Sequence, residues 1–523
     1  MPFYFMDFRQ KILDYYHLSE QDYIELTKPL EELSLPDFNA PPDMAKIKER
    51  IYKAIEYKEK IIIYGDYDCD GICSTSIMAK TFEKLGYPVS YYIPIRYQDG
   101  YGLNVKNVIK IKQAGFKLII CVDNGVCQVE AIKKANELGI DVIVIDHHEE
   151  GEERVEALGI IHPSISNISD VFGCGGFMSL ITSAALLGYY DPYLLTLAGL
   201  STVSDMMELK EYNRSVVRLA LENLKKFRYK PLISLLECEL ISEKSFGLEI
   251  APKINAVGRL VEDKTINRLV KFLLSENDEE IFKLFSWIKN TNELRKTLTK
   301  EAVEALPKDL FNEEGIVLKL DIKEGLIGLI ANRLLNEYNV PTIIFTKDST
   351  NESFLKGSIR SKEGFNVQKA FDSLSKYMVA GGGHALAGGL TIKEEYFEEF
   401  KTDFIRLAKE FKFIKEEPPS IEIKLQDISF KNYEILREFS PFGVGFAEPI
   451  FSLKNLPTRS LQFISFGKHL STPLSINSKI LGFNISESEI KSHLSVDLFG
   501  NLTTSLFKEK LSIEFRVSDY ITK

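Results

Sequence analysis

The stretch "IIIYGDYDCDGICSTS", residues 61–76, places three aspartates directly behind an apolar run. The run predicts a buried strand, because short apolar segments that end in polar turns are typical of strands in a covered sheet. Asp66, Asp68 and Asp70 follow it, and the stretch contains no lysine or arginine to offset their mutual repulsion. Bound cations would supply the missing positive charge.

Similar apolar runs recur at 89–94, 117–122 and 141–145, and helical patterns such as "STSIMAKTFEKLG" and "QVEAIKKANELG" lie between them. Strands that alternate with helices in this way are typical of an α/β domain with a largely parallel sheet. The first part of the chain is therefore expected to have this fold.

Three further segments of this part end in polar side chains. "LIICVDNG" supplies Asp123, "VIVIDHHEE" supplies Asp146, His147 and His148, and "LAGLSTVSDMMEL" supplies Asp205. Because the carboxyl ends of parallel strands open onto one crevice, these side chains are expected to meet the first aspartates there.

Carboxylates with one or two imidazoles and no thiolates suit divalent ions such as Mn²⁺ and Mg²⁺. Each segment alone has a simpler interpretation. A strand-end aspartate is often a helix N-cap, Asp70 before Gly71 can shape a turn, and one of the two adjacent histidines can be structural. The four segments together, each at the end of an element, favour a metal site.

The rest of the chain shows a change of pattern. A long polar helical pattern at 276–305 predicts a connector. A second, smaller α/β unit follows, with strands near 315–320 and 341–346 around the helix "GLIGLIANRLLNEY". "KEEPPS", residues 415–420, is the best linker candidate, because paired prolines stop helices. Short β-rich runs beyond it predict a small barrel or sandwich.

These patterns divide the 523 residues into four expected parts. They are an α/β domain with an N-terminal extension (1–215), a helical connector (216–305), the second α/β domain (306–414) and the β-rich domain (421–523).

Composition limits the classes of function. Apolar residues make up 45% and charged residues 27%, and no apolar run approaches the roughly 20 residues that span a bilayer. The six cysteines form no CxxC pair, and the chain starts without the regions of a signal peptide. We expect a cytoplasmic protein with no membrane partner. The net charge of −10 argues against nucleic-acid binding through bulk positive charge, so such a partner would need local basic surface or metal ions.

The motifs resemble those of a known family. "DYDCDG", "VDNG", "DHH" and "TVSD", in this order, resemble the four motifs of the DHH phosphoesterase superfamily. "GSIRS" and "GGGHALAGG" resemble the DHH-associated domain. "APKINAVGRL", "NTNELRK" and "REFSPFGVGFAEPIF" resemble segments of RecJ-type single-strand-specific exonucleases, the last at the entry to an OB-type domain. The resemblance implies an OB-like fold for residues 421–523.

The resemblance also implies roles for individual residues. The ligands of two divalent cations, with Mn²⁺ preferred and Mg²⁺ possible, would be Asp66, Asp68, Asp123, His147 and Asp205, and Asp123 would bridge the ions. His148 would complete the catalytic set close to the scissile phosphate. Substrate phosphate would be held by Arg259, Ser358, Arg360, Gly382, Gly383 and His384. Independently of the family, Gly381, Gly382 and Gly383 could let backbone amides approach a phosphate; the alternative is a flexible turn.

The function that the resemblance implies is a metal-dependent 5′ to 3′ exonuclease on single-stranded DNA, in DNA repair and recombination. Its partners would be single-stranded DNA and a helicase or a single-strand-binding protein. One alternative is a DHH-family phosphodiesterase for short oligonucleotides or cyclic dinucleotides, against which the extra C-terminal domain argues. The other is an inactive DNA-binding scaffold, against which the complete ligand set argues. Phe442, Phe446, Phe463 and Phe466 are candidate base-stacking rings, of which one or two are expected to be exposed.

Overall fold

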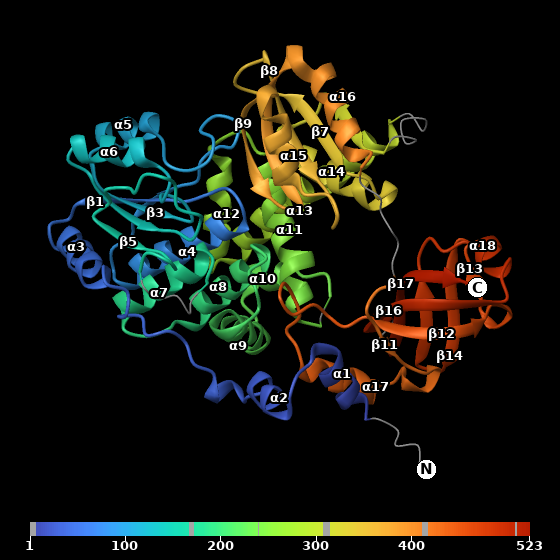
Figure 1. Ribbon diagram of the computed structural model, residues 1–523. Coiled ribbons are helices and arrows are strands. Elements are labelled where there is room, and N and C mark those ends of the chain that lie inside the picture. The colour runs from blue at the N-terminus through green and yellow to red at the C-terminus, as the bar shows by residue number, and fades with distance from the viewer. Residues whose placement is uncertain (1–6, 167–171, 239, 307–313, 411–416, 508–509) are drawn as a thin grey trace. The chain divides into compact units, whose positions relative to one another are not determined.

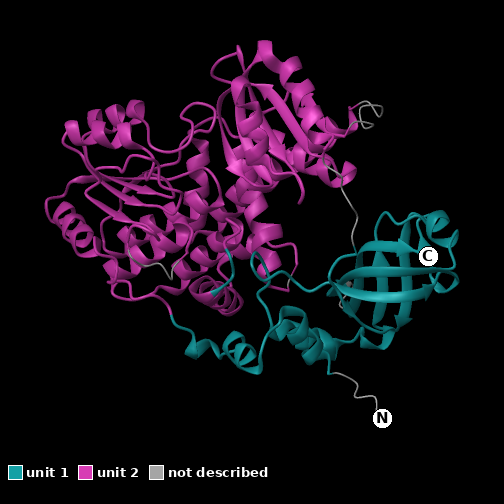
Figure 2. Cartoon of the chain, in the orientation of Figure 1, with its two compact units in different colours: residues 1–34, 208–210, 415–523 teal, residues 35–207, 211–414 magenta. Residues whose placement is uncertain are grey.

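Within the residues that the structure describes, the strands form three separate sheets (Figure 1). The computed structural model describes residues 7–166, 172–238, 240–306, 314–410, 417–507 and 510–523. The chain divides into two compact units (Figure 2): unit 1 holds residues 1–34, 208–210 and 415–523, and unit 2 holds residues 35–207 and 211–414.

The first sheet of unit 2 is entirely parallel, as the sequence predicts. Its order is β2-β1-β3-β4-β5. The strands are β1 (Lys60–Tyr64), β2 (Ser90–Tyr92), β3 (Phe116–Val122), β4 (Asp141–Ile145) and β5 (Gly159–Ile161). The short β5 has no counterpart in the sequence prediction. The central strands are isoleucine- and valine-rich and almost completely buried, because helices cover both faces.

Helices of two kinds surround this sheet. α5 and α6 are amphipathic and bury one side against β1, β3 and β4, whereas α4, α7 and α8 are buried over most of their length (Figure 1). The helices of this part are α3 (Met44–Glu56), α4 (Cys69–Lys84), α5 (Val105–Gln113), α6 (Val129–Glu137), α7 (Gly175–Leu187), α8 (Pro192–Ser204) and α9 (Glu211–Phe227).

A helical connector follows, and its main helix confirms the prediction at 276–305. The connector contains α10 (Lys230–Ser234), a π-helical turn η2 (Ser245–Ile250), α11 (Ala251–Leu260), α12 (Arg268–Leu274) and the 27-residue α13 (Asp278–Glu304). Asn277 caps α13 by accepting the N–H of Glu280, which fixes the start of the helix.

The second sheet of unit 2 has the order β6-β7-β8-β10-β9. Its strands are β6 (Ile316–Lys319), β7 (Thr342–Lys347), β8 (Phe354–Arg360), β9 (Met378–His384) and β10 (Ala387–Lys393), and its helices are α14 (Glu324–Tyr338), α15 (Val367–Leu374) and α16 (Phe397–Ala408). The expected strands at 315–320 and 341–346 and the helix between them are therefore present. The expected linker at 415–420 begins in residues outside the described ranges.

Unit 1 is built on the third sheet, in the order β11-β12-β16-β17-β15-β14-β13. The elements are β11 (Ile421–Glu422), α17 (Phe430–Glu438), β12 (Phe451–Pro457), β13 (Phe463–Ile464), β14 (His469–Ser475), β15 (Ser478–Gly482), α18 (Glu487–Lys491), β16 (Ser495–Phe507) and β17 (Lys510–Thr522). The predicted small β domain is thus present. Among the described residues, no helix of either unit is both long and apolar enough to cross a membrane.

The N-terminal residues differ from the sequence analysis, which placed them with the first α/β domain. α1 (Phe8–Tyr16) and α2 (Glu20–Leu26) belong to unit 1. Phe8, Ile12 and Leu13 of α1 are buried in the same core as Ile421, and Phe8 stacks on Phe451 at 5.6 Å between ring centroids. The core of unit 1 is therefore built from residues 8–13 together with residues 421–517.

Candidate metal centre

The ends of separate elements in unit 2 bring the predicted ligands together. Asp66 follows β1, Asp123 follows β3 and His147 lies two residues beyond β4. Asp68 is the N-cap of α4 and accepts the N–H of Gly71, so the capping role and the ligand role fall on one residue. Asp205 is the C-cap of α8. The shared edge of the parallel sheet explains why segments distant in sequence meet here.

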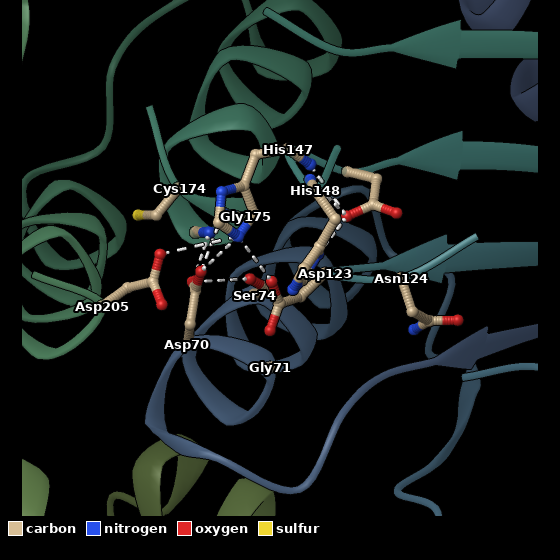
Figure 3. A network of polar contacts seen from close by, with 12 residues as sticks. Asp70, Gly71, Ser74, Asp123, Asn124, His147, His148, Cys174, Gly175 and Asp205 are labelled. Carbon is tan, nitrogen blue, oxygen red and sulfur yellow. Dashed lines mark hydrogen bonds and ion pairs between the residues drawn. The ribbon is translucent and has the colours of Figure 1, made fainter. Parts of the chain in front are cut away.

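The imidazole of His147 lies among three carboxylates, as Figure 3 shows. Its Nε2 is 3.2 Å from Oδ1 of Asp123, 3.5 Å from Oδ2 of Asp70 and 3.6 Å from Oδ2 of Asp205. Within the described parts of the chain, Nε2 nevertheless has no hydrogen-bond partner. Imidazole nitrogen with carboxylate oxygen is a ligand set that suits Mn²⁺.

Three sets of side chains offer ligand atoms that all lie within 4.8 Å of one another. They are Asp66, Asp68 and Asp123; Asp70, His147 and Asp205; and Asp123, His147 and His148. Oδ1 of Asp66 and Oδ1 of Asp123 are buried and, like Nε2 of His147, lack a hydrogen-bond partner among the described residues. Buried polar atoms without partners are rare in folded proteins, so these residues fit divalent cations well.

The backbone at Asp123 is specialised for close approach. Asp123 has a φ of 59°, in the left-handed region that aspartate and asparagine tolerate better than most residues. Its N–H donates to the carbonyl of Ile145 at 2.9 Å. A Cβ at Gly175 would lie 2.6 Å from Oδ1 of Asp123, so glycine is required there for the start of α7 to reach the site.

Burial and mutual repulsion make the carboxylates hard to ionise without a counter-charge. Burial, followed by the charges of Asp70 and Asp68, raises the pKa of Asp123 well above its usual range. Burial with the charge of Asp68 does the same to the pKa of Asp66. For Asp205, burial and the charge of Asp70 raise the pKa to about 8. Positive charge in the site would reverse these shifts.

Asp70 has a larger part in the site than the sequence analysis assigned to it. Its carboxylate accepts the N–H groups of Gly175 (2.8 Å) and Gly176 (2.7 Å) at the N-terminus of α7, and also the hydroxyl of Ser201. These donors turn the carboxylate towards His147 (Figure 3). The "GCGG" segment, residues 173–176, therefore opens α7 and also orients an acid of the site.

His148 is held by a second aspartate. Its Nδ1 donates to Oδ1 of Asp146 at 2.8 Å, and the hydroxyl of Tyr101 lies 3.0 Å from the same nitrogen. Burial alone would lower the pKa of His148, but the hydrogen bond and charge of Asp146 outweigh it and raise this pKa to about 9. Burial would raise the pKa of Asp146, but the hydrogen bond and charge of His148 outweigh it and lower this pKa to about 2. At neutral pH, His148 is therefore a cation beside the acidic cluster.

Four of the six residues predicted to bind phosphate lie on one face of the second sheet, whereas Arg259 lies in α11 and Gly383 has the alternate position in β9. Gly389 of the central strand β10 pairs with Ser358 of β8 on one side and with Gly382 of β9 on the other. Two residues away, Ala387 of β10 pairs in the same way with Arg360 and His384. Directly opposed strand residues point to the same side of a sheet. Register therefore brings Ser358, Arg360, Gly382 and His384 together.

The glycine-rich segment is mostly strand, and only Ala385 and Leu386 form the turn between β9 and β10. Gly382 and Gly383 lie in β9, at the edge of the sheet as described. A Cβ at Gly383, whose φ is 158°, would lie 2.3 Å from the carbonyl of Ala387, so this glycine allows the tight pairing with β10. An edge strand leaves alternate backbone N–H groups without a partner strand. Gly382 has no side chain that could cover these groups.

Four arginines form a cationic cluster that links the two sheets of unit 2. Burial, followed by the charges of Arg96 and Arg295, lowers the pKa of Arg259 to about 10. The charge of Arg360 also lowers this pKa, and the charge of Asp68 raises it. Nη1 of Arg259 donates to the carbonyl of Gly325 at 3.0 Å. Nε of Arg96 and Nε of Arg295 are buried without hydrogen-bond partners in the described chain. Such donors fit a phosphate.

Arg96 and Asn255 are site residues that the sequence analysis missed. The guanidinium of Arg96 lies 4.0 Å from the ring centroid of Tyr67, inside the first motif. Asn255 accepts the N–H of Cys69 at 2.8 Å, and so supports the turn that carries Asp66 and Asp68. Asn255 lies in the quoted "APKINAVGRL", but nothing in its local pattern indicates which distant turn it contacts.

Comparisons with known proteins agree with this architecture. The chain matches the profiles of the DHH family, N-terminal domain (residues 60–213), the DHHA1 domain (residues 312–411) and the RecJ OB domain (residues 420–519). It is 32% identical to the single-stranded-DNA-specific exonuclease RecJ of Bacillus subtilis, over 92% of this chain and 64% of that protein. It is 30% identical to RecJ of Salmonella typhimurium, over 77% of this chain and 76% of that protein.

A solved structure shows the same fold. The crystal structure of RecJ from Thermus thermophilus in complex with Mn²⁺ has a TM-score of 0.83, with 23% identity, over 99% of this chain and 76% of that one.

The parallel sheet with its carboxylate and imidazole cluster, followed by the second sheet, defines a protein of the DHH phosphoesterase class. Within this class, the chain belongs to the RecJ family of single-stranded-DNA-specific exonucleases. It spans about two thirds of the length of the Bacillus subtilis relative.

The acidic cluster predicts how stability depends on pH when metal is removed. With chelator present, the free energy of unfolding should fall as pH rises from about 6.5 to about 8. In the folded state, Asp205 and His148 have pKa values of about 8 and about 9, both above their ordinary values. The folded state therefore binds more protons than the unfolded state in this pH range, and the stability that these protons contribute is lost as pH rises.

The midpoint of thermal unfolding, measured in the presence of chelator across this pH range, tests the prediction. Mn²⁺ should raise the midpoint most at the alkaline end, because the ion competes with protons for the same oxygens. A midpoint in chelator that rises with pH would contradict the prediction.

Proposed function

We propose that this protein is a metal-dependent exonuclease that hydrolyses single-stranded DNA from the 5′ end, in DNA repair and recombination. The observation that carries the proposal is the set of buried, unpartnered oxygen and nitrogen atoms of Asp66, Asp123 and His147 beside a cluster of arginines. Relatives named as single-stranded-DNA-specific exonucleases support the substrate and reaction. We expect a cytoplasmic location, and a helicase or a single-strand-binding protein as a further partner.

We assign the binding of two divalent cations to Asp66, Asp68, Asp123, His147 and Asp205, with Asp123 shared between them. The presence of Asp123 in two of the three ligand sets supports the shared role. When bound, such cations lower the pKa of a water nucleophile and offset charge on the phosphate. Structures of RecJ from Thermus thermophilus have been solved with Mn²⁺ and with Mg²⁺. For this chain we propose a preference for Mn²⁺, which imidazole ligation favours.

The remaining groups act on the substrate. His148, held as a cation by Asp146, would donate a hydrogen bond to a phosphate oxygen at the scissile bond. Arg259 would hold the next phosphate, and the effects of both Asp68 and Arg360 on its pKa support this role. Ser358, Arg360, Gly382, Gly383 and His384 would hold the strand along the second sheet.

The alternatives are a phosphodiesterase for short oligonucleotides or cyclic dinucleotides and an inactive scaffold. A DHH enzyme for short substrates does not need a third sheet, whereas here the match to the RecJ OB domain covers residues 420–519. An inactive scaffold has no need of the proposed ligands, and all five are present. Both observations favour the exonuclease.

The C-terminal β domain offers one prominent candidate for base stacking. Phe466 is fully exposed, whereas Phe442 is buried and Phe446 and Phe463 are half-buried. Ser465 and Phe466 both have a φ of 56° and Gly467 has 78°, so the turn holds the ring away from the sheet. Lys468 and Lys491 line a hollow of about 640 Å³ with Phe466. We propose that a base of long substrates stacks on this ring.

The metal assignment predicts that Asp123→Asn lowers the rate of hydrolysis at least about a hundredfold. Substitution of a residue that only supports a metal ligand already lowers activity by up to about that factor. Asparagine keeps the shape and tolerates the positive φ, so the variant should fold. Initial rates on 5′-labelled single strands, with circular dichroism as the folding control, measure the effect. A folded variant with a tenth of the normal rate would refute the assignment.

Arg360→Lys should raise KM for single-stranded DNA about tenfold, with metal affinity unchanged. The Nη1 group of Arg360 donates to Ser358 and Ile359, which sets the plane of the guanidinium, and lysine cannot supply the remaining donors in that plane. Loss of one charge-assisted hydrogen bond accounts for about that factor. Arg333→Lys on the exposed side of α14 is the matched control. Equal KM values for the two variants would mean that Arg360 is structural.

Phe466→Ala should weaken binding of long single strands about tenfold and leave cleavage of dinucleotides unchanged, since one stacked base is worth about 1 to 3 kcal/mol. Ile476→Ala removes another fully exposed apolar side chain of the same domain and serves as the control. Fluorescence anisotropy with long and short oligonucleotides measures the difference. Unchanged affinity for the long strand would exclude stacking at Phe466.

A further inference from the structure

Within unit 2, the end of α11 meets the start of α14. α11 ends at Leu260, so the carbonyl of Arg259 lies in its last turn, where the helix has no further N–H group to pair with it. α14 begins at Glu324, so the N–H of Gly325 lies in its first turn and has no acceptor within the helix. Both backbone groups therefore need partners from elsewhere in the chain.

The side chain of Tyr97 supplies both partners. Its hydroxyl donates to the carbonyl of Arg259 and accepts the N–H of Gly325 at 3.3 Å. A phenolic hydroxyl can do both at once, because it carries one proton and has lone pairs that accept. Burial raises the pKa of Tyr97, so the hydroxyl keeps its proton. Tyr97 thus joins the end of one helix to the start of the next.

The guanidinium of Arg259 is held at the same junction. Its Nη1 donates to the carbonyl of Gly325 at 3.0 Å. A Cβ at Gly325 would lie 2.4 Å from the carbonyl oxygen of Arg259, so glycine is required for this close approach. Tyr97, Arg259 and Gly325 therefore form a closed ring of hydrogen bonds that includes both the backbone and the side chain of the arginine. Nη1 makes the one hydrogen bond of this guanidinium to the described residues, and the other N–H groups point to no protein acceptor there.

Tyr97 is presented by a turn of fixed shape. Oδ2 of Asp99 accepts the N–H of Ile95 at 2.9 Å, and the N–H of Asp99 donates to the carbonyl of Ile95 at 2.8 Å. Arg96, in the same turn, lies 4.0 Å from the ring centroid of Tyr67 in the first motif. The turn therefore carries one arginine of the cationic cluster itself and holds a second one through the hydroxyl of Tyr97.

Other contacts keep the junction together without this hydroxyl. Nζ of Lys323 donates to the carbonyl of Leu260 at 3.3 Å and pairs with the carboxylate of Glu262. Nε2 of Gln98 donates to the carbonyl of Glu262 at 2.9 Å. Removal of the hydroxyl alone should therefore leave the fold intact and change only how Arg259 is held.

We propose that Tyr97 is a positioning residue for Arg259, and that its hydroxyl holds the arginine against α14 in the orientation that receives a phosphate of the substrate strand. This inference rests on the proposed role of Arg259 in holding that phosphate. Tyr97 then acts on substrate affinity and not on the metal centre, because among the described residues its hydroxyl bonds to Arg259 and Gly325 and to none of the proposed metal ligands.

The test is Tyr97→Phe, which removes the hydroxyl and keeps the ring. We expect KM for single-stranded DNA to rise about fivefold, the factor for loss of one hydrogen bond worth about 1 kcal/mol, with kcat nearly unchanged. Mn²⁺ affinity, measured by calorimetry, should stay the same. Tyr190→Phe is the matched control, because that hydroxyl also donates to a backbone carbonyl of unit 2, that of Pro36 at 2.7 Å. A folded Tyr97→Phe variant with the KM of Tyr190→Phe overturns the positioning role.

Arg259→Gln separates a failure of this inference from a failure of the proposed function. If this substitution leaves KM unchanged, the proposed role of Arg259 in phosphate binding is refuted. If it raises KM, the double variant with Tyr97→Phe should have the same KM as Arg259→Gln alone, because a residue that acts through another adds nothing once its partner is lost. Effects that multiply in the double variant would show that Tyr97 acts by another route, and would overturn the positioning role alone.

Discussion

Repulsion between carboxylates in a place closed to water is the constraint on which unit 2 depends. Two like charges about 4 Å apart repel by about 4 kcal/mol at the effective dielectric of a protein near its surface. Asp66, Asp123 and Asp205 have raised pKa values because burial and this repulsion act together. The sheet edge holds the groups in place against their own repulsion, and divalent cations turn that unfavourable arrangement into a binding site.

The opposite sign of charge is gathered in the same unit. The charges of Arg96, Arg295 and Arg360 all lower the pKa of Arg259, and the charge of Asp68 acts in the opposite direction. A phosphodiester has one negative charge per unit, so a strand that followed the proposed path from the acidic cluster along the second sheet would meet these cations. Asp68 and Arg259 would then mark the border between the proposed metal-binding region and the proposed phosphate-binding region.

The local pattern of the sequence was sufficient for β1 to β4 of the parallel sheet, though not for the short β5, and for the clustering of the polar residues at the strand ends. β1, β3 and β4 are continuous apolar runs, so the positions of Asp66, Asp123 and His147 followed from the rule that parallel strands end at one edge. The part of Asp70 could not be predicted in this way, because it depends on the amides of Gly175 and Gly176, more than 100 residues away. The roles of the proposed ligands stay predictions until the variants are measured. Two further features could not be read from the local sequence for the same physical reason. The glycines of "GGGHALAGG" suggest a loop by their intrinsic freedom, but pairing of β9 with β10 overrides it. α1 has an ordinary amphipathic pattern that indicates a buried face and not which core covers it, and its contact with Ile421, across most of the chain, leaves no trace in either local sequence.

The placement of α1 has a consequence for the order in which the protein is made. A ribosome releases the chain from its N-terminus, and domains generally fold as they emerge. Phe8, Ile12 and Leu13 then have no core to enter until residues 421–517 have been synthesised, by which time all of unit 2 is already outside the ribosome. Unit 1 must close last, because its core joins two segments that are far apart in the sequence. Unfinished chains, released early by a broken message, would therefore leave the apolar face of α1 uncovered, and exposed apolar side chains are a feature that chaperones and proteases of quality control recognise.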